Sequence, residues 1–158
     1  MTRLYGRAEP GQRVVESTSG YSGAHYTLVA TLGIDGVSAP FMFEGAMNQE
    51  IFDMYLDYVL IPDMQPGEVL LLDNLSSHKL PDLEERLAKH GIRVIFLPPY
   101  SPDFNPIEKC WSKVKAALRR AKARTFDTLV DAIKLAFDSV SFIDALHWFA
   151  HCGYSYAN

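Results

Sequence analysis

Two short apolar runs with a helical pattern between them constrain the fold of this chain more than any other feature. The first run, EVLLLD, ends at Asp73, and the second, IRVIFL, ends at Leu97. The intervening LPDLEERLAKHG has the spacing of a helix closed by Gly91. Strand, helix and strand within about thirty residues form a βαβ unit, so the two strands should be parallel, and both should be buried.

The segment before this unit predicts a hairpin and a helix. AHYTLVATLG and VSAPFMFEG are two β-rich runs joined by Ile34-Asp35-Gly36, which is a strong hairpin signal. NQEIFDMYLDYVLIP has helical spacing, with Asn48 as the expected N-cap and Pro62 as the expected stop. VVES near Val14 could form a further short strand.

The C-terminal third predicts three helices. They run from Pro106 to about Arg124, through TFDTLVDAIKLAFDSV with Thr125 as N-cap, and through SFIDALHWFAHCGY. The sequence has no internal repeat and no linker, and its 158 residues with 48% hydrophobic content suit one domain. The prediction is therefore a single α/β domain.

Composition excludes several other classes. The sequence has no apolar run long enough for a membrane span and no signal peptide, so we expect a cytoplasmic protein without membrane contact. Cys110 and Cys152 lie far apart without CxxC spacing, which predicts reduced thiols rather than a disulfide framework or a zinc site.

The proline-rich stretch LPPYSPDFNPIEKCW leads directly to Glu108. Asn105 is a good N-cap, Pro106 suits the first helical position, and Glu108 then falls where a capping box places its acid. Glu108 could therefore be only a cap. The alternative is a site, because Asp73 follows a buried strand at the carboxyl edge of the sheet, where ligands bind in open α/β folds, and the prolines could return Glu108 to that edge.

Two carboxylates that converge would repel each other unless cations relieve the repulsion. Oxygen ligands of this kind favour Mg²⁺ or Mn²⁺, and a pair of such ions is a clamp for phosphoryl transfer. We therefore predict that Asp73 and Glu108 are metal ligands and catalytic residues.

Charge is unevenly distributed along the chain. Residues 1–78 carry three basic and ten acidic side chains, whereas residues 79–158 carry twelve and nine. Seven of those twelve basic residues fall within residues 109–124, which contain no acid. Such a segment is either a solvated helix face or a surface for DNA phosphates. The predicted DNA-binding residues are Lys109, Lys113, Lys115, Arg119 and Arg120.

DNLSSHK, LPPYSPDFNPIEKCW and HWFAHCGY together resemble the catalytic domain of DDE transposases of the mariner superfamily, in particular the bacterial insertion-sequence branch. The resemblance covers essentially the whole chain. It implies a ribonuclease H-like mixed sheet flanked by helices, and DNA transposition by a metal-dependent endonuclease that cuts transposon ends and joins them to target DNA. It also implies three acidic ligands for two Mg²⁺ or Mn²⁺ ions, with Asp73 as the second and Glu108 as the third.

The chain departs from the family pattern at its start. The family's first aspartate lies on an apolar central strand before the segment that TRLYGRAEPGQR resembles, and we expect this strand and the N-terminal helix-turn-helix region to be missing from residues 1–158. Glu16, Asp35 and Glu44 are the early acids near predicted strands, but none follows a buried run. Two readings follow: a catalytic domain that is inactive as an isolated fragment, or a non-catalytic remnant that binds DNA or intact transposase.

The remaining polar candidates keep alternative interpretations. His78 could orient a ligand or bond to the backbone, and the family block favours a supporting role in the site. Asn74 and Asn105 could bond to Asp73 or cap helices. His147 and His151 stand four residues apart, but HWFAH lacks the glutamate of HExxH, so we expect them to pack. Trp111 and Trp148 should also pack. A second copy of the chain or an N-terminal transposase segment is a further expected partner.

Overall fold

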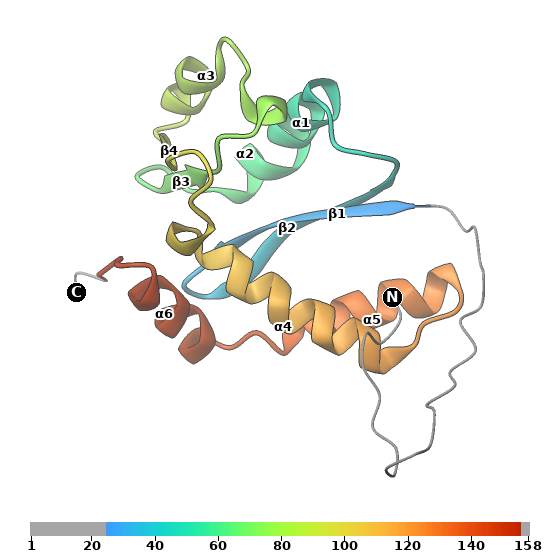
Figure 1. The fold of residues 1–158 in the computed structure, drawn as a ribbon. Helices are drawn as coiled ribbons and strands as arrows, with labels where there is room; N and C mark the ends of the chain where they lie inside the picture. The colour runs from blue at the N-terminus through green and yellow to red at the C-terminus, as the bar shows by residue number, and fades with distance from the viewer. Residues whose placement is uncertain (1–24, 156–158) are drawn as a thin grey trace, which may run out of the picture.

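The computed structural model describes residues 25–155. VVES near Val14 lies outside these residues. Within them, no helix is long and apolar enough to cross a membrane. Figure 1 shows a β-hairpin in the middle of the molecule, with the helices and strands of residues 49–96 on one side of it and the helices of residues 106–151 on the other.

The hairpin consists of β1 (Tyr26–Gly33) and β2 (Gly36–Glu44), paired antiparallel as predicted. Its register shifts between Val29 and Thr31, where β2 carries an extra residue and Ala39 adopts a left-handed φ of 47°. The hydroxyl of Tyr55 donates a 2.9 Å hydrogen bond to the carbonyl oxygen of Ala39. This hydrogen bond ties the bulge of β2 to the helix that contains Tyr55.

The predicted helix after the hairpin is present but contains a π-helical turn. It runs as α1 (Gln49–Tyr55), the π-helix η1 (Leu56–Leu60) and α2 (Ile61–Asp63). The Asn48 side chain accepts a 2.8 Å hydrogen bond from the backbone N–H of Ile51, which confirms the N-cap. Pro62 lies inside α2 instead of stopping the helix. The π-helical turn lies just before this proline, which has no N–H to donate to the helix.

The βαβ unit is confirmed. β3 (Val69–Leu72) pairs parallel with β4 (Arg93–Phe96), and α3 (Leu83–Lys89) connects them and ends at Gly91, whose φ is 73°. The prediction that both strands are buried was wrong. Val69 is 40% exposed and Ile95 is 41% exposed, because among residues 25–155 β4 has no neighbour other than β3, and β3 borders a cavity.

The three C-terminal helices are also confirmed. Lys122 ends the first of them with a left-handed φ of 50°, so Arg124 lies beyond it. Thr125 and Ser141 cap the second and third through capping boxes. Their bounds are α4 (Pro106–Ala121), α5 (Phe126–Asp138) and α6 (Phe142–His151), and the short helices η2 (Ser76–His78) and η3 (Pro102–Phe104) precede α3 and α4.

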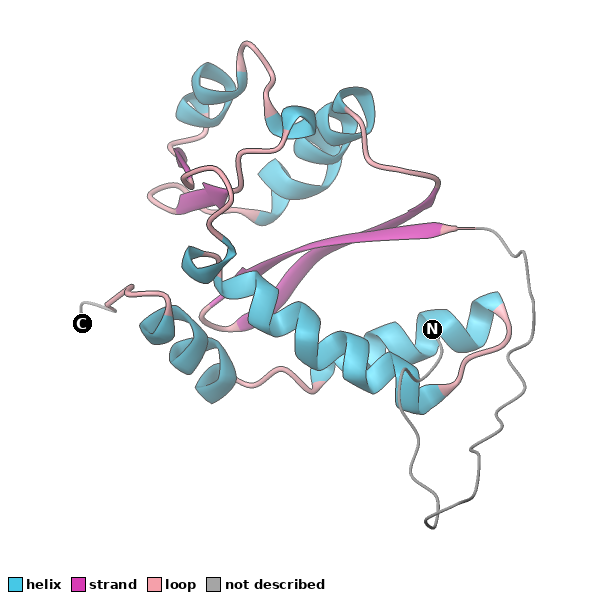
Figure 2. Ribbon diagram, in the orientation of Figure 1, coloured by secondary structure: helices cyan, strands magenta, loops and turns pink. Residues whose placement is uncertain are grey.

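Two apolar clusters form the core. The first lies between the α1–α2 helical segment, β3 and α3, and the second lies between α4 and α5. Trp111 and Trp148 pack against the second cluster, as expected. Figure 2 shows the hairpin between these two groups of helices.

The resemblance implies a mixed sheet flanked by helices, with its central strand missing from the chain. In the described part of the chain, β1 and β2 form one two-stranded sheet, and β3 and β4 form another. No strand within residues 25–155 joins the two sheets.

Candidate functional site

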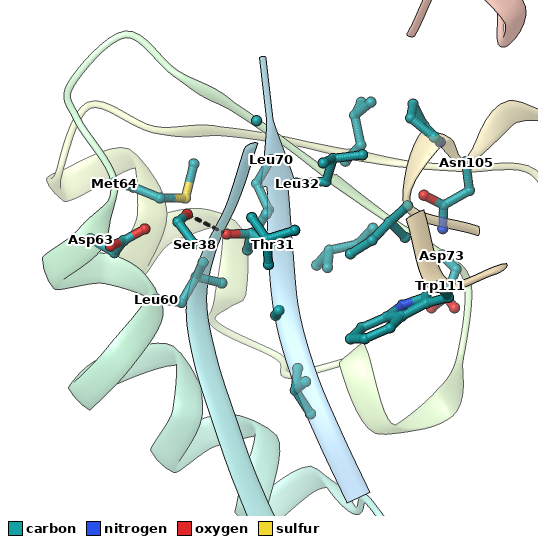
Figure 3. Close-up of a pocket in the computed structure, with 18 of the residues that line it drawn as sticks. Thr31, Leu32, Ser38, Leu60, Asp63, Met64, Leu70, Asp73, Asn105 and Trp111 are labelled. Carbon is teal, nitrogen blue, oxygen red and sulfur yellow. Dashed lines mark hydrogen bonds between the residues drawn. The ribbon is translucent and has the colours of Figure 1, made fainter. Parts of the chain in front are cut away.

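A cavity of about 860 Å³ lies between the two sheets. Residues 28–33 of β1 and residues 69–72 of β3 line it, and side chains from α1, α2, α4 and α6 complete its walls. In the view of Figure 3, Asp73, Asn105 and Trp111 lie to one side of β1, and Leu60, Asp63 and Met64 lie to the other. We refer to this space as the central cavity.

Asp73 and Glu108 both line the central cavity, although they are far apart in sequence. Asp73 directly follows β3, and its Oδ1 accepts a 3.4 Å hydrogen bond from the backbone N–H of Leu75. Glu108 lies in the first turn of α4 and is exposed. The two carboxylates that the sequence assigned to one site therefore lie at the wall of one cavity.

The alternative role of Glu108 as a helix cap has no support in the local geometry. The backbone N–H of Asn105, which a capping box would offer to Glu108, donates to the carbonyl oxygen of Pro102 at 3.0 Å. The Asn105 side chain makes no capping hydrogen bond either. Asn105 instead lines the central cavity beside Glu108, so the start of α4 presents two polar side chains to it.

His78 holds the position of Asp73. Its Nδ1 lies 2.7 Å from Oδ1 of Asp73, a close contact without the alignment of a hydrogen bond. The imidazole also packs against Phe52 of α1, with ring centroids 4.5 Å apart and the ring planes tilted by 40°. Phe52 was not identified from the sequence, since one apolar residue in an amphipathic helix gives no signal of such a contact. Asn74 is half-buried and does not line the cavity.

Among residues 25–155, no group of three or more His, Cys, Asp or Glu side chains is close enough together to hold a metal ion. Carboxylate oxygens suit Mg²⁺ or Mn²⁺, and Asp73 and Glu108 are two of the five carboxylates that line the central cavity. Of the early acids, Asp35 lies in the hairpin turn and lines the cavity, Glu44 is exposed at the end of β2, and Glu16 lies outside the described residues.

His147 and His151 are exposed on α6, so the expectation that they pack was wrong. Asp63 and Glu68 also line the central cavity and were missed. Asp63 is the last residue of α2 and Glu68 follows a turn, and an acid at either place carries no site signal in the sequence. Burial raises the pKa of the Cys110 thiol to about 11, which agrees with an unreactive core cysteine.

The basic residues of α4 fall on two faces of the helix. Successive residues are rotated by about 100°, which places Lys115 and Arg119 on the face of Glu108 and Lys109, Lys113 and Arg120 about 120° away. We call the first set the Glu108 face and the second set the α6 face. Lys115 and Arg120 are exposed, and Arg119 is half-buried.

Lys113 is held within the fold. Its ammonium donates to Oδ2 of Asp144 and to the carbonyl oxygen of Ser139, both at 2.6 Å. The hydrogen bond from Lys113, followed by those from Ser141, holds the pKa of Asp144 well below its usual range. Lys113 therefore joins α4 to α6. Although it is one of the five predicted DNA-binding residues, its ammonium group already donates to two acceptors within the fold.

This chain is similar to known proteins in sequence and in fold. Residues 1–130 match the DDE superfamily endonuclease family. Two solved structures share the fold: the Mos1 strand transfer complex, with a TM-score of 0.73 and 17% identity, and the Mos1 transposase paired-end complex with left transposon end, with a TM-score of 0.65 and 16% identity. Each match covers 96% of this chain, which spans less than half of the Mos1 chains, 46% and 47%. No curated protein matches in sequence. The likeness supports the ribonuclease H-like fold class.

Proposed function

Because the chain belongs to the DDE superfamily endonucleases, we propose that it is the catalytic domain of a transposase and acts on the DNA of transposon ends. The observation that carries the proposal is the placement of Asp73 and Glu108 at the wall of one cavity, at the end of β3 and the start of α4. The domain would extend over residues 1–158 and belong to an insertion-sequence transposase.

We propose that Asp73 and Glu108 supply two oxygen ligands to Mg²⁺ or Mn²⁺. When bound, such ions polarise a phosphodiester and lower the pKa of the attacking water or 3′ hydroxyl. His78 then has the role of a positioning residue, because it contacts Asp73 and is itself fixed by Phe52. Asn105 is placed to support the same site from the start of α4.

In this proposal, the DNA binds along the Glu108 face of α4. Lys115 and Arg119 continue from Glu108 along one side of the helix, so phosphates bound there would run toward the carboxylates. Contacts to phosphates do not distinguish the four bases, so this surface positions DNA and does not read its sequence.

A second candidate is a domain that binds DNA or an intact transposase without cutting DNA. It is favoured by the finding that residues 25–155 contain no group of three acids suited to a metal ion. The two candidates differ in one measurement. When an apolar strand that carries Asp-Glu is added before residue 1, only the first candidate gives Mn²⁺-dependent nicking of a supercoiled plasmid.

Metal binding tests the site directly. We expect the full chain to bind Mn²⁺ weakly, and Asp73→Asn and Glu108→Gln each to weaken binding by about tenfold, because each removes an anionic ligand. Glu84→Gln is the matched control, since Glu84 is an exposed acid of α3 outside the central cavity. Calorimetric titration with Mn²⁺ is the measurement. Equal affinity in the wild type, Asp73→Asn and Glu108→Gln would show that the two carboxylates do not share a metal.

A further inference from the structure

The C-terminal motif HWFAHCGY ends beside the start of α4. Figure 1 shows the end of α6 near the start of α4. The chain turns after α6 at Gly153, whose φ is 86°. The backbone N–H of Tyr154 then donates a 3.0 Å hydrogen bond to the carbonyl oxygen of Phe149, and the two rings meet edge to face with centroids 6.1 Å apart. This turn places the Tyr154 ring against α6.

The hydroxyl of Tyr154 reaches the segment before α4. It donates a 2.8 Å hydrogen bond to the carbonyl oxygen of Phe104, which is the last residue of η3. Burial raises the pKa of Tyr154, and the thiol of Cys152 acts in the same direction, so the hydroxyl keeps its proton and remains a donor at neutral pH. The C-terminal segment is therefore tied to the end of η3.

Asn105 is the hinge between η3 and α4. Its φ of −106° and ψ of 102° are extended rather than helical, so η3 and α4 have different directions. Pro102 and Pro106 have fixed φ angles on either side of it. The torsions of Asn105 therefore set the direction in which α4 starts, and an anchor on the preceding carbonyl group limits their change.

The direction of α4 decides where Glu108 lies. Glu108 is in the first turn of the helix, and its backbone N–H donates to the carbonyl oxygen of Asn105 at 3.2 Å. Asp73 is held independently, by β3 and by the contact with His78. A rotation at Asn105 would therefore move one carboxylate of the candidate site and leave the other in place.

The contact of Lys113 with α6 acts further along α4 and does not hold its first turn, where backbone N–H groups lack helical partners. The end of α6 lies against this first turn. Burial raises the pKa of the Cys152 thiol, and the charges of Lys109 and Asp103, on either side of the hinge, also act on it. The hydrogen bond from Tyr154 thus joins two segments that are already neighbours.

We propose that Tyr154 is a positioning residue of the candidate metal site. Through the carbonyl oxygen of Phe104 it fixes the start of α4, and with it the carboxylate of Glu108 relative to Asp73. This inference rests on the metal-ligand role proposed for Glu108. It gives a part in the site to the C-terminal motif, which lies beyond the residues 1–130 that match the family.

The test is a double-mutant cycle in the full 158-residue chain, with Mn²⁺ affinity by calorimetry as the readout. Tyr154→Phe removes the hydroxyl and keeps the ring against Phe149, so we expect Mn²⁺ affinity to fall about threefold. In the Glu108→Gln background the positioned carboxylate is gone, and Tyr154→Phe should cause no further loss. Tyr100→Phe is the matched control, because Tyr100 precedes η3 and its side chain is fully exposed.

Amide hydrogen exchange, followed residue by residue by NMR, tests the same contact without metal. The backbone N–H groups of Phe104, Asn105 and Glu108 donate within the turns around the hinge. Tyr154→Phe should speed their exchange about threefold or more, because the hinge opens locally. Amides of residues 113–118, in the same helix, should exchange at the wild-type rate.

Three results would overturn the proposal. The first is a loss of about tenfold in Mn²⁺ affinity for Glu108→Gln with no loss for Tyr154→Phe, which would keep the metal site and remove Tyr154 from it. The second is an equal loss from Tyr154→Phe in both backgrounds, since the effect would then not pass through Glu108. The third is unchanged exchange of the three hinge amides in Tyr154→Phe.

Failure of the proposed function gives a different result. Glu108→Gln alone would then leave Mn²⁺ affinity unchanged, and the positioning role of Tyr154 would fail with the site that it serves.

Discussion

Lys113 of α4 and Asp144 of α6 are joined by a contact of 2.6 Å between Nζ and Oδ2. The same carboxylate accepts hydrogen bonds from the backbone N–H and the hydroxyl of Ser141 at the start of α6. One side chain thus caps α6 and fixes α6 against α4. A basic residue that looked from the sequence like a phosphate contact is therefore part of the packing of the C-terminal helices.

Replacing Lys113 by Met should lower the free energy of unfolding by about 1 kcal/mol at pH 7, a value reduced for the solvent exposure of both partners. Since the pKa of Asp144 is depressed in the folded state, its contribution is complete above the unfolded pKa of about 3.9 and is lost as the pH falls through the folded value. Urea unfolding at pH 7 and at pH 2.5 should show the difference between wild type and variant shrinking in acid. Lys134→Met on the exposed part of α5 is the control.

The two faces of α4 predict different effects on DNA binding for adjacent residues. Arg119→Gln combined with Lys115→Gln should reduce the slope of log affinity against log salt by about 2, because about 0.9 counterion is released per phosphate contact. Arg120→Gln, one position along the helix but on the α6 face, should change the slope less than Arg119→Gln. Fluorescence anisotropy with a fixed duplex at several salt concentrations provides the measurement. Equal effects of the two arginine variants would mean that α4 has no preferred face for DNA.

His78 should affect metal binding through Asp73. His78→Phe keeps an aromatic ring against Phe52 but removes the contact with Asp73, so we expect Mn²⁺ affinity to fall several-fold with little change in melting temperature. His78→Ala removes both contacts and should lower stability as well. His90→Phe at the exposed end of α3 is the control. Unchanged Mn²⁺ affinity in His78→Phe would show that the imidazole serves only packing.

Tyr55→Phe should destabilise the protein by about 1–2 kcal/mol, because it leaves the carbonyl oxygen of Ala39 in a buried place without its donor. Tyr58→Phe is a matched control three residues away, since Tyr58 is 79% exposed. Denaturant unfolding of the two variants measures the difference. A Tyr55→Phe variant as stable as Tyr58→Phe would show that water replaces the hydroxyl at the bulge.

The order of elements could be predicted from the sequence because each has a local signal. Asp35-Gly36 fixes the hairpin, Asn48 and Thr125 cap their helices, and Gly91 ends α3. The two strand pairings could also be predicted, from the Asp35-Gly36 turn and from the βαβ order. The exposure of Val69 and Ile95 could not be predicted, since it depends on which strand edges find a partner. The apolar sequence of β3 predicts a buried strand, yet within residues 25–155 only one of its edges is paired. The resemblance named Asp73, His78 and Glu108, while the contacts of Lys113 and Phe52 arise from tertiary packing that has no sequence pattern.

The left-handed residue Lys122 marks where α4 stops and thereby limits the length of the surface that we propose for DNA. From Glu108 to Arg119 the helix rises about 16.5 Å, at about 1.5 Å per residue. One base pair of B-DNA rises about 3.4 Å along the axis, so this stretch of α4 corresponds to about five base pairs. Positions on the proposed DNA surface can therefore be given as distances along α4 from Glu108. In the proposed function, adding or removing one helical turn before Lys115 would move the phosphates bound by Lys115 and Arg119 by about 1.6 base pairs relative to Glu108.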